Sequence, residues 1–372
     1  MTAPIDIKGR SLSELAPVKA AFAVNFAEDL DLGARFSVVR DGEVVFDHWA
    51  GVADRASGAP WTDETIAAIY SSGKAVCACL VAQLVEDGAL EYDRPVADYW
   101  PEFAAAGKAS ITVAQVMSHQ GGLCGFTEEF PSTDWLDWPT MVGKIEAMAP
   151  LWSPGEKNGY HPQTFGIIVG ELIRRVSGRS VGAHLRAAYA DDPLNSVHCG
   201  FADPISEFAA TMTKPPRAPD LGPINPYREA AFLKRWSSAP PKPVEAWRAA
   251  EIPASNMHAT ALGLARTLQP LAGAGGLSEQ TLDAAFRIRI AGDDLVLPFH
   301  LQWAAGLFVN PDGAYGPDPS VFCHSGFGGS CIVVDRKRRL TAAYVMNKMS
   351  PSLIGDERPR RLLWALYEAL GQ

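Results

Sequence analysis

The spacing of hydrophobic and polar residues changes along the chain from a strand pattern to a helix pattern and back. Residues 35–51 contain two strand-like runs joined by Asp41-Gly42, a dipeptide that favours the two-residue turn of a hairpin. From about residue 71 to 290, apolar residues recur at helical spacing. Strand-like runs return towards the C-terminus, at 300–309, 330–335 and 340–347. We therefore predict an antiparallel sheet that is built from both termini, with a helical domain inserted between them.

Four segments of the helical zone have spacing that predicts helices, at 74–87, 111–119, 164–178 and 259–273. A further amphipathic helix is predicted at 358–370. Residues 214–243 are crowded with prolines, which indicates a long surface loop or a lid. This α/β (α+β) organisation predicts a discontinuous sheet-containing domain (1–70 and 292–372) and a mainly helical domain (71–291), with the active site at their junction.

Composition narrows the class of partner. The chain has 372 residues, of which 47% are hydrophobic and 20% charged, and a formal net charge of -9 without a long Lys/Arg run. This balance argues against nucleic-acid and anionic-membrane surfaces and favours a small-molecule ligand. The N-terminus lacks the pattern of a signal peptide, and no stretch of about 18 apolar residues occurs, so we expect a cytoplasmic protein. The six cysteines are then expected to be free thiols.

Lys74 stands at the head of a segment that is otherwise almost wholly apolar. From Lys74 to Val85 the only other polar side chain is Gln83, so the predicted helix must be buried. Ser71 lies three residues before Lys74, and i, i+3 positions share one face of a helix. A Ser–Lys pair can form an activated nucleophile, because a desolvated lysine has a lowered pKa. The tetrapeptide alone also fits a helix cap with a snorkelling lysine; the buried helix favours the pair.

The order and spacing of several motifs resemble those of serine β-lactamases and penicillin-binding proteins, and especially their esterase branch, the family VIII carboxylesterases. The resemblance covers most of the chain. It rests on Ser71-Ser72-Gly73-Lys74 and on the stretches 84–103, 111–123, 153–173 and 324–330. It implies a β-lactamase-like fold and a serine hydrolase that needs no cofactor or metal.

The resemblance also implies roles for individual residues. Ser71 matches the acylated nucleophile, Lys74 its partner one helical turn on, and Tyr160 the tyrosine that shares the role of base. His324-Ser325-Gly326 takes the place of the lactamase Lys-Thr-Gly motif beside the cleft, and is expected to contact substrate. The backbone N–H of Phe327 matches the second oxyanion donor, with that of Ser71 as the first. The chain departs from the family pattern at His161-Pro162, where x-Asn is usual after the tyrosine, and at His324.

The chemistry of these residues supports the same set. A nearby ammonium would lower the pKa of Tyr160, so Lys74 and Tyr160 are expected to titrate as a coupled pair. Which of them accepts the serine proton stays open. The N–H of Ser71, at a helix N-terminus, is a good donor for a developing oxyanion.

Two other signals in the sequence suggest different chemistry. Residues 178–182 fit G-x-S-x-G, the nucleophile elbow of α/β-hydrolases, but a helix-like segment precedes Ser180 where a strand is required. We therefore interpret Ser180 as a helix cap. The histidines lack the spacing of metal ligands, and core or neighbouring roles are favoured for them: His119, His161, His258 and His324. His161, Trp152 and Trp303 remain candidates for substrate contact, with plain core packing an equal alternative for the tryptophans.

Together these observations predict a serine carboxylesterase that hydrolyses short-chain acyl esters through an acyl-enzyme on Ser71. The same fold also hosts amide, β-lactam and linear-oligomer hydrolases and acyltransferases, so these stay open as alternatives. A non-catalytic binding scaffold is a further alternative, against which the presence of Ser71, Lys74 and Tyr160 together argues. The oligomeric state is not predicted.

Overall fold

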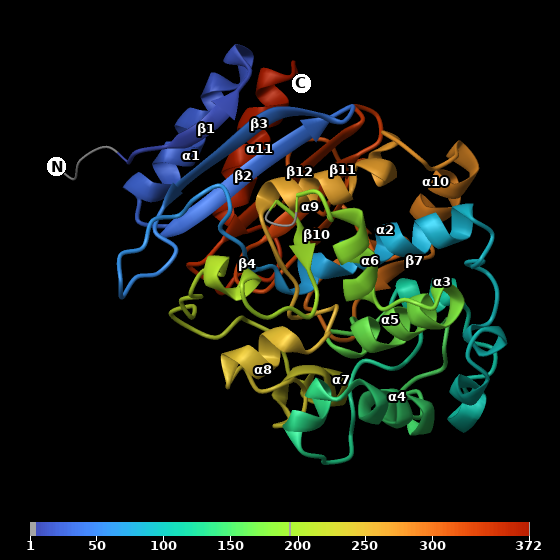
Figure 1. Ribbon diagram of the computed structural model, residues 1–372. Helices are drawn as coiled ribbons and strands as arrows, with labels where there is room; N and C mark the ends of the chain where they lie inside the picture. Colours follow the sequence, from blue (N-terminus) through green and yellow to red (C-terminus); the bar gives the residue numbers. More distant parts are fainter. Residues whose placement is uncertain (1–4, 193–194, 372) are drawn as a thin grey trace.

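A central antiparallel sheet organises the molecule (Figure 1). The computed structural model describes residues 5–192 and 195–371. Within them the sheet order is β1-β3-β2-β12-β11-β10-β9-β8-β7. The strands are β1 (Lys8–Ser11), β2 (Gly33–Arg40), β3 (Glu43–Gly51), β7 (Ile290–Asp293), β8 (His300–Trp303), β9 (Phe308–Val309), β10 (Phe322–Ser325), β11 (Cys331–Asp335) and β12 (Leu340–Met346). The prediction of a sheet built from both ends of the chain is therefore confirmed.

The predicted hairpin joins β2 to β3. Asp41 and Gly42 both have positive φ, 51° and 81°, as a type I′ turn requires, and Arg40 pairs with Glu43 across the turn. Residues 300–309 were expected to form one strand, but the structure divides them into β8 and β9. Gly306, between these strands, donates its N–H to Met117 O at 2.9 Å, and a Cβ there would lie 2.8 Å from Ala78 Cβ. This close approach to the helical layer interrupts the strand.

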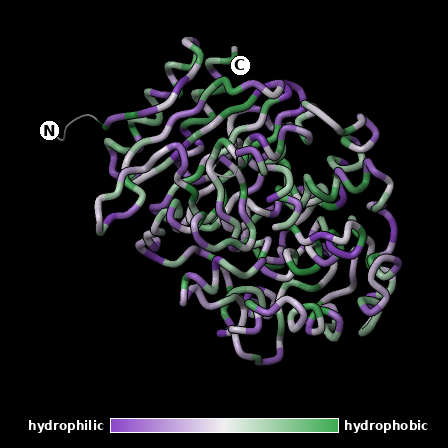
Figure 2. The backbone as a smooth tube through the Cα atoms, viewed as in Figure 1, coloured by the Kyte–Doolittle hydropathy of each residue, from purple (hydrophilic) through white to green (hydrophobic). Residues whose placement is uncertain are grey.

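Helices cover both faces of the sheet. On one face, α1 (Ala16–Ala27) and α11 (Glu357–Ala369) lie side by side. On the other, α9 (Ala261–Thr267) packs on β2 and β12, and α2 (Gly73–Glu86) lies next to it. Alternation along β11 serves both layers: Ile332 and Val334 pack with the α2 side, and Val333 packs with the α1–α11 side. Apolar segments accordingly run through the central strands and more polar ones through outer loops (Figure 2).

The remaining helices are α3 (Val113–Met117), α4 (Trp138–Ala147), α5 (Thr164–Ser177), α6 (Val181–Ala188), α7 (Pro226–Arg228), α8 (Val244–Ala249) and α10 (Glu279–Phe286). Most of them lie below the sheet in Figure 1, and α10 lies to its right. Tighter or wider turns are η1 (Ser13–Leu15), η2 (Tyr70–Ser72), η3 (Val96–Asp98), η4 (Pro101–Gly107), η5 (Ser132–Leu136), η6 (Ile205–Phe208), η7 (Glu229–Leu233, a π-helix) and η8 (Gln269–Ala272). A second, small sheet has the order β4-β6-β5: β4 (Ala67–Ala68), β5 (Val197–His198) and β6 (His258–Ala259).

Local signals explain several of the helix ends. Gly88, with a φ of 70°, follows α2, and Gly178, with a φ of 71°, caps α5, at the ends of the helices predicted at 74–87 and 164–178. Thr112 and Gln115 form a reciprocal capping box at the start of α3. All six cysteines are buried free thiols, as expected. No helix in the described part of the chain is long and apolar enough to cross a lipid bilayer.

Candidate active site

Ser71 lies in a constrained turn between β4 and α2. Its neighbour Tyr70 has a φ of 45°, a conformation that costs a non-glycine residue about 1–3 kcal/mol unless its surroundings impose it. The surroundings here do so: Ile69 N donates to Met257 O at 2.9 Å, and Ser330 Oγ donates to Ile69 O at 2.8 Å. The turn therefore presents Ser71 at the N-terminus of α2, where the first backbone N–H groups have no partner within the helix.

The Lys74 side chain is fully buried and directed at Ser71. Its Nζ lies 3.0 Å from Ser71 Oγ, 2.8 Å from Pro162 O and 3.3 Å from Ala254 O. Burial lowers the pKa of Lys74 well below its ordinary value. A neutral amine has two N–H groups, which match the two carbonyls, and one lone pair, which is then left for the Ser71 hydroxyl. This geometry suits proton acceptance from the serine.

Tyr160 covers the Ser71–Lys74 pair. The centre of its ring lies 4.8 Å from Lys74 Nζ. Burial raises the pKa of Tyr160 above its ordinary value, and a hydrogen bond with Ser71 acts in the opposite direction but is weaker. The expected lowering of this pKa by an adjacent ammonium is not what the structure gives, because burial of the phenol itself is the dominant cause. Burial thus favours the uncharged form of both the phenol and the amine.

An aromatic and histidine layer holds Tyr160 in place. Trp303 stacks on its ring, with centroids 5.9 Å apart and planes at 15°, and His119 packs edge-on against both rings. His324 lies on the same pair of rings at centroid distances of 6.1 and 6.0 Å. Burial lowers the pKa of His324 to about 3, so this ring is neutral at ordinary pH.

A pocket of about 560 Å³ opens beside Ser71. Of the residues proposed from the sequence, it is lined by Ser71, Tyr160, Trp303, His324, Ser325 and Phe327. Lys74 reaches the site from behind Ser71. Gly326 lets two backbone segments lie close together, because a Cβ at this position would lie 2.0 Å from Ile69 O. Much of the remaining wall comes from the proline-rich segment 214–243, including Phe232 and Leu233, so the segment covers the site as a lid would.

Besides Lys74 and Gly326, two sequence candidates do not line this pocket. His161 is 1% exposed, and both of its ring nitrogens are used: Nε2 accepts from Leu123 N at 2.9 Å, and Nδ1 contacts Gly159 O at 2.6 Å. Trp152 packs against His161 and donates its indole N–H to Lys157 O at 3.0 Å. Both residues support the segment that carries Tyr160 from behind, where they do not meet the pocket.

Asp294 is a supporting residue for which the sequence gave no signal. Its carboxylate is 4% exposed and accepts from Tyr160 N and Asn158 Nδ2, each at 2.9 Å. It also accepts from Val296 N and Leu297 N, each at 2.9 Å. One buried carboxylate thus fixes the backbone of Tyr160 to the loop that follows β7. The partners are 134 residues apart in sequence, and no local motif marks such a contact.

Ser180 is a helix cap, as interpreted from the sequence. The helix α5 precedes it, and its Oγ accepts from Ala183 N at 3.2 Å and donates to Glu251 Oε1 at 2.8 Å. The strand that a nucleophile elbow requires is replaced here by a helix.

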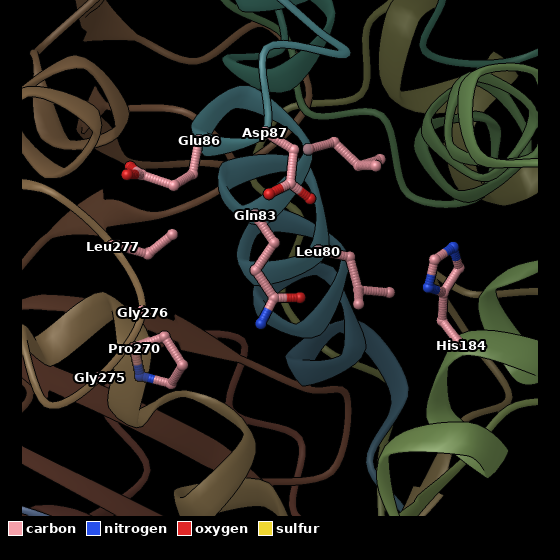
Figure 3. A pocket seen from close by; sticks show the side chains of 10 residues that line it. Leu80, Gln83, Glu86, Asp87, His184, Pro270, Gly275, Gly276 and Leu277 are labelled. Carbon is pink, nitrogen blue, oxygen red and sulfur yellow. The ribbon is translucent and has the colours of Figure 1, made fainter.

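A second pocket of about 270 Å³ lies on the outer side of α2 (Figure 3). Leu80, Gln83 and Asp87 project into it from the helix, and His184 faces them from the opposite side. Ser71, Lys74 and Tyr160 are absent from its lining. It is therefore separate from the candidate active site.

Comparisons with known proteins agree with this geometry. Residues 22–365 match the family model described as "Beta-lactamase". The chain is 31% identical to "Esterase/beta-lactamase LipL" of Mycobacterium tuberculosis, an alignment that covers 94% of this chain and 85% of that protein. A penicillin-binding protein homologue from Caulobacter crescentus superposes with a TM-score of 0.92 at 44% identity, covering 98% of this chain and 100% of the other. A family VIII carboxylesterase superposes with a TM-score of 0.89 at 34% identity, covering 98% and 100%.

Proposed function

Because the chain belongs to the beta-lactamase family and is a serine hydrolase, we propose that it is a carboxylesterase that hydrolyses short-chain acyl esters through an acyl-enzyme on Ser71. The observation that carries the proposal is the buried Lys74 amine 3.0 Å from Ser71 Oγ, in a pocket beside a neutral tyrosine. A serine hydroxyl is a weak nucleophile without such a base.

Each step of the reaction then has a residue to perform it. The Lys74 amine accepts the Ser71 proton as Oγ attacks the ester carbonyl carbon, and the N–H groups of Ser71 and Phe327 stabilise the oxyanion. Collapse of the tetrahedral intermediate breaks the bond to the alcohol oxygen. Tyr160 donates its proton to this leaving oxygen and recovers a proton from the Lys74 ammonium. Water then attacks the acyl carbonyl with the same pair as base, which releases the acid and restores Ser71.

Esters fit this pocket better than β-lactams. In the lactamases that the chain resembles, an asparagine binds the substrate side-chain amide, and a lysine and a threonine hold the substrate carboxylate. Pro162, His324 and Ser325 take those places here, and the pKa of about 3 leaves His324 uncharged. Each lost charge-assisted contact costs about 1.5–3 kcal/mol in binding. An ester still meets the nucleophile and both oxyanion donors.

We expect kcat/KM for p-nitrophenyl acetate or butyrate to exceed that for nitrocefin or a cephalosporin by about 10²-fold, the equivalent of one lost charge-assisted contact at His324 and one lost neutral hydrogen bond at Pro162. Steady-state kinetics on the same enzyme preparation measures the ratio. Comparable values, or a preference for the lactam, would make the protein a β-lactamase instead.

The pH dependence of kcat/KM is expected to show an acid limb that belongs to Lys74. Burial lowers this pKa, so the amine is neutral above it and takes a proton as the pH falls through it, which removes the lone pair and the activity. His161 and His324, each with a pKa of about 3, stay neutral over the ordinary range. The residual activity of Lys74→Met should therefore show no such fall at acid pH. If the fall persists in this variant, another group is responsible for it.

A further inference from the structure

The buried phenol of Tyr315 contacts a hydroxyl of the pocket. Tyr315 is 1% exposed and lies between β9 and β10. Its OH is hydrogen-bonded to Ser325 Oγ. Asn310 fixes its backbone, because Asn310 Oδ1 accepts from Tyr315 N at 2.9 Å while Asn310 Nδ2 donates to Gly316 O at 2.9 Å. The phenol is therefore held in one place behind Ser325.

The direction of this hydrogen bond follows from the burial of the phenol. Tyr315 is 1% exposed, and burial raises its pKa, so the phenol keeps its proton and needs an acceptor for it. Within the described residues, Ser325 Oγ is the acceptor that the structure gives for that proton. Tyr315 then donates to Ser325, and the Ser325 hydroxyl proton is free to point elsewhere.

The free direction is the pocket. Ser325 lines it together with Ser71. The Ser325 backbone is fixed, since His324 Nδ1 donates to Ser325 O at 2.8 Å and Gly326 N donates to Ser330 O at 2.7 Å. Only the hydroxyl rotor remains, and Tyr315 determines its orientation.

We propose that Tyr315 is a positioning residue that turns the Ser325 hydroxyl proton into the pocket, so that Ser325 donates to an uncharged acceptor oxygen of the substrate besides the reacting carbonyl. This rests on the proposed esterase function and names its substrate class: short esters that carry a second oxygen, such as an ether or a keto group. An uncharged acceptor is favoured because the neighbouring His324 is neutral.

Two pairs of isosteric esters test the proposal, each differing by oxygen in place of methylene. On the acyl side these are p-nitrophenyl methoxyacetate and p-nitrophenyl butyrate; on the alcohol side, 2-methoxyethyl acetate and butyl acetate. Ser325→Ala and Tyr315→Phe should each lower kcat/KM for the oxygen-bearing ester of at least one pair by about 3–10-fold, the worth of one neutral hydrogen bond. The loss on the methylene partner should be smaller by that factor, because a methylene offers no acceptor to the Ser325 hydroxyl. Comparing each variant with the wild type cancels the different intrinsic reactivities of the esters.

The double variant Tyr315→Phe/Ser325→Ala distinguishes a positioning role of Tyr315 from a general structural effect. Tyr315→Phe should change nothing further in the Ser325→Ala background, because the tyrosine acts through that hydroxyl. Ser325→Thr, which keeps a hydroxyl, should retain the discrimination. Tyr367→Phe is the matched control, since it removes another buried phenol hydroxyl, bonded to Asp335 at 3.1 Å, without touching Ser325.

The opposite results would overturn the proposal. These are equal losses on both members of each pair, or a Tyr315→Phe effect that persists without the Ser325 hydroxyl. A wild-type enzyme that hydrolyses the esters with no sensitivity to either substitution overturns this inference alone. A wild-type enzyme that hydrolyses none of the four esters overturns the proposed function with it.

Discussion

Ser71→Ala is expected to lower kcat for p-nitrophenyl acetate by about 10³-fold or more, as for other covalent nucleophiles. Alanine keeps the turn and the helix but removes the oxygen that lies 3.0 Å from Lys74 Nζ. The fold should be preserved, because Ser71 is only partly buried and is not the residue with positive φ. Initial rates and a thermal unfolding curve measure the two effects separately.

Ser180→Ala is the matched control. Its hydroxyl caps α6, so the substitution should reduce the free energy of unfolding by about 1 kcal/mol and leave kcat near the wild-type value. Intact-protein mass after incubation with a fluorophosphonate should show one adduct in the wild type and in Ser180→Ala, and none in Ser71→Ala. Exchanged phenotypes would favour the α/β-hydrolase mechanism.

The features that the sequence predicted well are those with local causes. The Asp41-Gly42 turn needs only two adjacent residues that tolerate positive φ, and its strands pair directly across it. The Ser71–Lys74 contact needs only the pitch of one helical turn. Gly178 and Ser180 act within one turn of the helices that they bound.

The features that escaped prediction depend on residues distant in sequence. Asp294 reaches Tyr160 across 134 positions, and Tyr315 matters only because β9 and β10 bring its phenol behind Ser325. The pKa of Tyr160 was expected to fall because two groups were considered alone. Complete burial of Lys74 and Tyr160 reversed the direction, and burial of this kind is a property of the tertiary structure.

Lys74→Met and Tyr160→Phe are each expected to reduce kcat/KM for an alkyl ester such as ethyl acetate by about 10²- to 10⁴-fold, the range for a lost general acid or base. Methionine has a similar length and suits the apolar environment, so Lys74→Met should still fold, although Pro162 O and Ala254 O lose a donor. Tyr160→Phe keeps the stacking on Trp303 and loses only the phenol oxygen. Unfolding curves check that activity, not folding, is lost.

The leaving group of the ester separates the two roles. Lys74 takes the proton from Ser71 before any bond to the alcohol breaks, so its loss should slow every ester alike. Tyr160 hands a proton to the departing oxygen, which matters greatly for an alkoxide such as ethoxide and little for p-nitrophenolate, a stable anion. Tyr160→Phe should therefore lose more activity on ethyl acetate than on p-nitrophenyl acetate, whereas Lys74→Met should lose similar factors on both.

Near wild-type kcat/KM on ethyl acetate in Tyr160→Phe would remove the phenol from the mechanism. If instead only Lys74→Met loses more activity on ethyl acetate than on p-nitrophenyl acetate, the two roles are exchanged. The phenolate of Tyr160 would then be the base and the Lys74 ammonium the acid.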